Sequence, residues 1–136
     1  MTKSVLQLQT PDEAEIIFYE AFMHGDKAVM AAVWADGDVV CVHPGSGVIL
    51  GYDTVIRSWH HILENTQGSE IRYTATKKNV SDDLAVHIVA EEMMDKGSVM
   101  AVVISTNVYQ KFDQGWLMIE HHASLVQQLR QGETVQ

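Results

Sequence analysis

The chain has 136 residues, of which 46% are hydrophobic and 20% charged, a composition typical of a folded domain rather than a disordered chain. Its net charge of −9 disfavours nucleic acid as a partner, because affinity for the phosphate backbone comes from clustered Lys and Arg. The longest apolar run, residues 99–104, is far shorter than the ~20 residues of a membrane helix, so we expect no membrane span.

Two helices are expected to open the fold. The string Thr10-Pro11-Asp12-Glu13 combines an N-cap, a proline at the first helical position and a Glu three residues after the cap. The apolar residues that follow recur at the spacing of one buried helix face, and Gly25 ends the helix. Asp26 is predicted to cap a second, shorter helix that runs to about Ala35.

A short strand and a third helix follow. Residues 39–42 are mostly β-branched and apolar, and they lead His43 directly into a turn at Pro44-Gly45-Ser46-Gly47. Gly51-Tyr52-Asp53 starts a third, amphipathic helix, which is predicted to close at Gln67-Gly68.

The C-terminal half is predicted to form four strands, at residues 71–77, 84–94, 99–111 and 116–126. The connections are short and rich in turn-forming residues, which favours an antiparallel meander. Helices first and sheet last indicate an α+β fold, with the helices against one face of a curved sheet. The polar tail from Gln127 is expected to fray.

Two features bear on the location of the protein in the cell. Residues 1–9 contain no apolar block of signal-peptide length. Cys41 is the single cysteine, so it cannot form an internal disulfide, and we expect it to be a small buried residue on a strand. Both features favour a cytoplasmic location.

His43 is the strongest candidate for a functional group, because it stands where a strand runs into a Gly-rich loop. A neutral imidazole there can take or pass on a proton near pH 7. The alternative is a structural histidine bonded to a backbone carbonyl, and His122 is open to a similar pair of interpretations. His87 is expected to point outward from its strand.

Neighbouring residues of a strand point to opposite faces of a sheet. Only one of His121 and His122 can therefore face a helix-covered interior, and the same holds for Glu91 and Glu92; the pattern alone does not decide which. His43, His122 and one of these glutamates could form a two-His, one-carboxylate set. No local ligand pair, P-loop or dinucleotide motif is present, so we predict no metal and no cofactor.

Several strings of residues together resemble the SnoaL-like branch of the nuclear-transport-factor-2-like superfamily. They are Gly25-Asp26, Trp34-Ala35, Val42-His43-Pro44-Gly45, Gly51 with Ser58-Trp59, Thr106-Asn107-Val108, and Trp116 with His121-His122-Ala123-Ser124. They span about residues 11–126, the expected core of a single domain over residues 1–136. The resemblance implies a cone-shaped roll, in which three helices pack on a strongly bent, mostly antiparallel sheet, enclose a pocket and leave the outer sheet face for a homodimer.

Ketosteroid isomerase belongs to the same superfamily and uses an Asp base, with a Tyr and a protonated Asp as its oxyanion hole. The resemblance places His43 at the position of that base. The tyrosine position falls on Phe18, with Tyr19 one step around the helix. The acid position falls near Asn107 or Val108, and an asparagine amide can donate a hydrogen bond to a carbonyl oxygen.

The same resemblance implies which face of the last strand lines the pocket. It puts Glu120, His122 and Ser124 on the pocket side and His121 outside. On a neighbouring strand Glu92 is the expected inward carboxylate, paired with His122.

These expectations lead to two hypotheses of function. The first is a small isomerase, cyclase or lyase that binds a mostly apolar carbonyl compound, with His43 moving a proton and His122 and Asn107 holding or polarising the oxygen. The second is a non-catalytic dimeric module that binds a ligand or a protein. The other residues expected to line the pocket are Trp34, Trp59, Met30, Phe18, Tyr19, Glu92 and Glu120.

Overall fold

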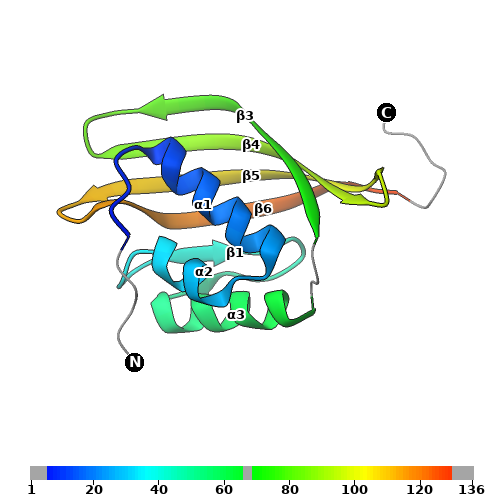
Figure 1. Ribbon diagram of the computed structural model, residues 1–136, viewed down its shortest axis with the longest axis horizontal. Coiled ribbons are helices and arrows are strands. Elements are labelled where there is room, and N and C mark those ends of the chain that lie inside the picture. Colours follow the sequence, from blue (N-terminus) through cyan, green and yellow to red (C-terminus); the bar gives the residue numbers. More distant parts are fainter. Residues whose placement is uncertain (1–5, 66–68, 130–136) are drawn as a thin grey trace.

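The computed structural model describes residues 6–65 and 69–129 of the chain. Within them come the helices α1 (Pro11–His24), α2 (Lys27–Val33) and α3 (Tyr52–Asn65), with the short strands β1 (Val40–Val42) and β2 (Ile49–Leu50) preceding α3. Four long strands follow, β3 (Glu70–Val80), β4 (Leu84–Asp95), β5 (Ser98–Phe112) and β6 (Gly115–Gln128). The predicted α+β class is confirmed, with helices on one face of a curved sheet (Figure 1).

The ends of the first two helices follow from short sequence signals. Thr10 Oγ1 accepts a hydrogen bond from the Glu13 N–H at 3.1 Å, as the cap motif predicts. Gly25 has a left-handed φ of 65°, which glycine adopts without a steric penalty, and it ends α1. Asp26 Oδ1 then accepts from the Val29 N–H at 3.1 Å and caps α2.

Helix α2 ends at Val33, two residues before the predicted end at Ala35. Trp34 already has extended backbone, and the Ala35 N–H donates to the Met118 carbonyl at 2.9 Å. Pairing with β6 therefore takes the backbone groups that another helical turn would need. The predicted end of the third helix, at Gln67-Gly68, lies outside the described residues.

The sheet has the strand order β2, β1, β6, β5, β4, β3. Strands β3 to β6 form the predicted antiparallel meander, whereas β1 runs parallel to β6. Strand β6 continues into the segment expected to fray, because Gln127 and Gln128 pair with Val102 and Ala101 on β5. Residues 130–136 lie outside the described part of the chain.

The core lies between the helices and the sheet face that they cover, which we call the inner face; the opposite face is the outer face. Helix α1 runs obliquely across the long strands, with α2 and α3 beside β1 (Figure 1). Phe18, Tyr19, Met30, Trp34 and Trp59 each expose 1% or less of their surface. Removing such large apolar side chains from water is the main source of stability in this layer.

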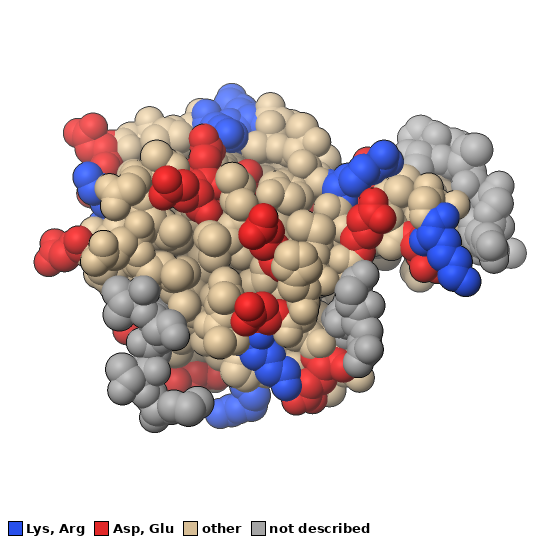
Figure 2. Space-filling model, in the orientation of Figure 1, with Lys and Arg blue, Asp and Glu red and all other residues tan. Residues whose placement is uncertain are grey.

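The helix-covered side of the molecule shows no block of one charge. In the view of Figure 2, acidic and basic side chains are interspersed over it. Among the described residues, no helix is long and apolar enough to cross a membrane.

Candidate functional site

A row of polar side chains crosses the inner face beneath α1. His87 on β4 pairs in register with Asn107 on β5, and Asn107 pairs with His121 on β6. All three side chains are at least 98% buried. Because buried polar groups are costly unless they are hydrogen-bonded, each member needs a partner in the protein.

The structure corrects the predicted orientation of β6. His122 is exposed, Glu120 is partly exposed and both lie on the outer face with Ser124, whereas His121 is only 2% exposed. The reason is the parallel pairing with β1, which sets His121 beside the buried Cys41. Side-by-side residues of paired strands point to the same face, so His121 is the inward histidine.

The inward carboxylate is Glu91 rather than the predicted Glu92. Glu91 is 1% exposed, and its Oε2 accepts the hydroxyl hydrogen of Tyr19. Glu92 lies on the outer face, where its Oε1 is 3.2 Å from Nη2 of Arg72. Glu92 and His122 share the outer face, but Glu92 pairs with Val102 and His122 with Thr106, so the predicted pairing of Glu92 with His122 is wrong.

The buried polar side chains of the inner face form two groups. His87, predicted to point outward, is fully buried and belongs to one of them. Its Nδ1 is 2.7 Å from Oε2 of Glu15 on α1. The Tyr109 hydroxyl donates to the same oxygen at 3.2 Å. This group holds α1 against β4 and β5.

The other polar group, which we call the Glu91 network, consists of Glu91, Tyr19, Asn107 and His121. Asn107 Nδ2 donates to the Tyr19 hydroxyl oxygen at 2.9 Å, and Asn107 Oδ1 is 2.5 Å from His121 Nδ1. Asn107 is thus buried and inward as predicted, but its amide is bonded within the protein at both ends.

Burial shifts the pKa values of this network strongly. It raises the pKa of Glu91 to about 6, and it raises the pKa of Tyr19 well above its usual value. It lowers the pKa of His121 to about 3, so this imidazole is neutral at physiological pH.

His43 is half-buried at the end of β1, where sequence analysis placed it. Its backbone N–H donates to Ser46 Oγ at 2.9 Å, which holds the start of the turn. Its ring Nε2 is 2.9 Å from Ser58 Oγ on α3, and burial lowers its pKa. The ring also meets the edge of Trp59, with centroids 4.8 Å apart.

Cys41 lies beside His43 but is not a second candidate for the proton-transfer group. Its sulfur is 3.9 Å from Nδ1 and 3.8 Å from Nε2 of His43. Burial raises the pKa of the thiol to about 12, which keeps it protonated. The prediction of a small buried residue on a strand is confirmed.

Trp59 and Phe18 form an aromatic layer beside His43 and His121. Trp59 contacts both imidazoles, with its centroid 4.8 Å from His43 and 5.6 Å from His121. Phe18 packs 5.0 Å from His121 and 5.3 Å from Trp59. His43 and the Glu91 network therefore meet across one aromatic layer.

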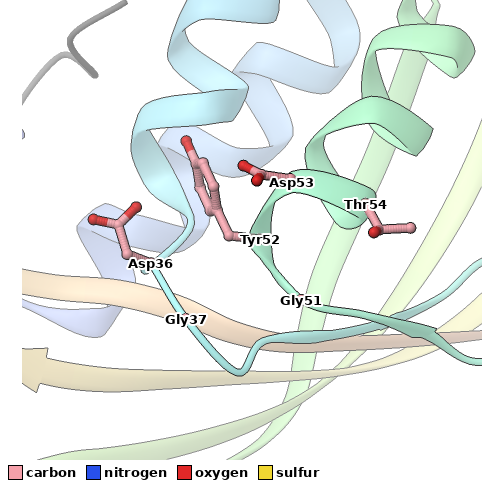
Figure 3. Close-up of a pocket in the computed structure, with 6 residues that line it drawn as sticks. All are labelled: Asp36, Gly37, Gly51, Tyr52, Asp53 and Thr54. Atoms are coloured by element: carbon pink, nitrogen blue, oxygen red, sulfur yellow. The ribbon is translucent and has the colours of Figure 1, made fainter.

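Three surface hollows are formed by described residues elsewhere. Figure 3 shows the largest, about 480 Å³, at the start of α3, lined by Asp36, Gly37, Gly51, Tyr52, Asp53 and Thr54. A second, of about 290 Å³, lies where Gln7 to Gln9 pass the turn between β5 and β6, and a third, of about 130 Å³, lies between α1 and α2. None of these three is lined by His43 or His121. The pocket expected behind Met30 and Trp34 stays a prediction.

No metal-binding cluster is formed within residues 6–65 and 69–129, since no three His, Cys, Asp or Glu side chains there converge as ligands would. The proposed set of His43, His122 and a glutamate is also separated by the sheet, because His122 lies on the outer face.

A family model described as the SnoaL-like domain matches residues 17–128. The chain belongs to this family. A candidate calcium/calmodulin-dependent protein kinase type II association domain from Thiobacillus denitrificans is 31% identical, with a TM-score of 0.84 over 90% of this chain and 99% of that one. A candidate dehydratase of the NTF2-like family from Streptomyces avermitilis is 30% identical, with a TM-score of 0.74 over 86% and 99%. Ketosteroid isomerase-like and cystatin-like structures of lower identity share the fold.

A curated relative is the F-box protein SKIP8 of Arabidopsis thaliana, 29% identical over 99 residues. The match covers 71% of this chain and spans 41% of the length of that protein. The similarity is thus to one part of a longer protein.

The residues missed by sequence analysis are Glu15, His87, Glu91 and His121 on the inner layer, and Ser58 beside His43. In β4 the alternating pattern carried little information, because the outer positions Val86, Ile88 and Ala90 are as apolar as the inner Ala85 and Val89. The pairing of His121 with Cys41 was the missing signal, and it exists only in the folded sheet.

Proposed function

We propose that the protein binds a small, mostly apolar carbonyl compound and transfers a proton next to the carbonyl group, with His43 as the base. The observation that carries the proposal is the environment of His43: a half-buried imidazole with a lowered pKa, fixed on one nitrogen and packed against Trp59. The reaction class is that of an isomerase, cyclase or lyase.

Ser58 determines which nitrogen is the base. Its hydroxyl donates to the Val55 carbonyl at 2.6 Å, so its single hydrogen is already used. The contact with His43 must then run from the Nε2–H to the serine oxygen. This leaves the lone pair on Nδ1 of His43, which takes the proton in the proposed reaction.

A lowered pKa suits this role, because the ring is neutral and ready to accept a proton at physiological pH. Removal of a proton from the carbon beside the carbonyl gives an enolate, which is either protonated at another position or loses a leaving group. Similarity to a candidate dehydratase at 30% identity supports the second outcome.

The test is solvent-deuterium exchange into cyclohexanone, followed by proton NMR in D₂O. His43→Gln keeps an N–H to donate to Ser58 but has no basic nitrogen, so exchange should fall roughly 100-fold or more. His61→Gln, on the exposed side of α3, is the matched control and should exchange at the wild-type rate. Unchanged exchange in His43→Gln, or a large loss of melting temperature with exchange intact, would favour a structural histidine.

A second candidate function is a non-catalytic dimeric module, and two observations favour it. The outer face is apolar along β4 and β5, where Val86, Ile88 and Ala90 are partly accessible and Ile104 is 37% exposed. The 31% identity to a candidate association domain also supports assembly. A specific, stable protein–protein interface buries about 800 Å² on each partner.

Light scattering coupled to gel filtration tests the dimer. Ile104→Glu places a charge at the middle of the outer face and should convert a dimer into a monomer. Ile16→Glu, at an exposed apolar position on α1 and so on the opposite side of the molecule, is the matched control and should leave the mass unchanged. A wild-type monomer at all concentrations would refute the dimer without bearing on the proton transfer.

A further inference from the structure

The geometry points to His121 Nε2 as a hydrogen-bond acceptor held in place by the Glu91 network, so that the ligand of this site carries an O–H or N–H donor in addition to its carbonyl group. Asn107 is then a positioning residue, which acts on the ligand only through His121. The inference rests on the proposed function in one respect, that His43 and His121 serve the same ligand.

The direction of each hydrogen in the network follows from Glu91. An ionised carboxylate can only accept, so the Tyr19 hydroxyl gives its single hydrogen to Glu91 Oε2. The Tyr19 oxygen must then accept from Asn107, and the atom of Asn107 that faces it is the amide nitrogen. Asn107 Oδ1 is left facing His121.

This orientation selects one tautomer of His121. Because Asn107 Oδ1 is an acceptor, His121 Nδ1 must carry the hydrogen of their 2.5 Å contact. A neutral imidazole has one hydrogen, so its Nε2 carries a lone pair. No described residue forms a hydrogen bond with this nitrogen.

The unpartnered nitrogen belongs to the same aromatic layer as His43. Phe18 and Trp59 are the rings packed on His121, and Trp59 also contacts His43. Both imidazoles therefore border the Trp59 ring, and the proposed shared ligand would lie beside this ring. A simple ketone has only hydrogen-bond acceptors and cannot bond to the lone pairs of the two imidazoles, whereas a hydroxy ketone has an O–H that can donate to one of them.

The Glu91 network costs more free energy of folding than an apolar core at the same positions would. It buries four polar side chains where apolar residues would pack without hydrogen-bonding requirements, and buried polar groups in such networks favour one arrangement only when all partners are present. Departures from an apolar core of this kind are expected at functional sites. A binding role for the remaining acceptor gives the network a purpose that packing alone does not.

The first test reads the tautomer directly, in wild-type protein labelled with ¹⁵N-histidine. Long-range ¹H–¹⁵N NMR at about pH 7.5 should show His121 with hydrogen on Nδ1 and a bare Nε2. Asn107→Leu should release this preference. A wild-type spectrum with hydrogen on Nε2 would overturn the inference, and this measurement needs no variant to fold.

The second test measures binding of 3-hydroxycyclohexanone and of its methyl ether, 3-methoxycyclohexanone, by chemical-shift titration. Loss of one hydrogen bond to a neutral acceptor corresponds to roughly tenfold in affinity, so wild type should prefer the hydroxy compound by about that factor. His121→Phe should abolish the preference, and Asn107→Leu should reduce it. Equal binding of the two compounds, or binding of neither, would overturn the inference.

These tests separate the inference from the proposed reaction. His43→Gln should lose deuterium exchange while it keeps the hydroxyl preference and the His121 tautomer. Preference without exchange in wild type would refute proton transfer and leave the acceptor role standing. Exchange without preference would do the reverse.

Discussion

His121 makes the stability of the folded protein depend on pH. Burial lowers its pKa to about 3, whereas the unfolded chain has the ordinary histidine pKa near 6.5. Below about pH 6.5 the unfolded state therefore binds a proton at this ring that the folded state does not bind. The stabilising contribution is present at neutral pH and is lost as the pH falls from about 6.5 toward 3.

The size of the effect follows from the width of this window. About pH 5 is roughly 1.5 units below the pKa of the His121 ring in the unfolded chain, so that ring is protonated there, while the ring in the folded protein is still neutral. At about 1.36 kcal/mol per unit, titration of His121 alone should lower the free energy of unfolding by about 2 kcal/mol between pH 7.5 and pH 5, a loss that the titration of Glu91 partly offsets. This corresponds to roughly a 30-fold change in the unfolding equilibrium.

Urea unfolding at the two pH values measures this loss in wild type, His121→Gln and His122→Gln. The glutamine amide in His121→Gln can still donate to Asn107 but does not titrate, so about 2 kcal/mol of the pH dependence should disappear. His122→Gln changes the exposed neighbour and should keep all of it. The reasoning is refuted if the His121 variant retains the dependence, or if the His122 variant loses it.

Three further changes test the packing and the charges around the site. Burial raises the pKa of Glu91 from about 4.5 to about 6, so its stabilising contribution is present below pH 4.5 and is lost as the pH rises through 6. Because about pH 5 already lies inside this window, Glu91→Gln should remove about 1 kcal/mol of this opposite dependence in the same urea experiments. Gly115→Ala should lower stability by about 1–3 kcal/mol, because its Cβ would lie 2.5 Å from the Leu8 carbonyl oxygen at a φ of 119°. Gly47→Ala, which has open space around the added Cβ, is the control and should change stability by no more than about 0.5 kcal/mol. Equal melting temperatures of the two variants would contradict the predicted clash at Gly115. Trp59→Ala should cost about 3–5 kcal/mol in urea unfolding, and a loss below about 1 kcal/mol would show that the aromatic layer is not tightly packed.

The local features of the fold were open to prediction because they depend on residues close together in sequence. The Thr10 and Asp26 caps each bond to a backbone N–H three residues ahead, and both were predicted. The early end of α2 at Val33 was not, because Ala35 bonds to Met118, more than eighty residues away.

The position of His43 was predictable because a strand that ends in a Pro-Gly turn is visible in the sequence. Its partner Ser58 was not identified, since the contact joins the end of β1 to α3. The tautomer of His43, and with it the basic nitrogen, depends on that contact and on the further bond of Ser58 to Val55.

By itself the sequence determined the succession of helices and strands, the helix caps, and the rule that His121 and His122 point to opposite sides. Only the tertiary structure decided that His121 and Glu91 are the inward members of their pairs. The physical reason is that a β-strand is locally symmetric between its two faces, and the outer face here is apolar as well. The choice was made by the helices that cover one face and by the parallel pairing of β1 with β6, which sets His121 beside the buried Cys41.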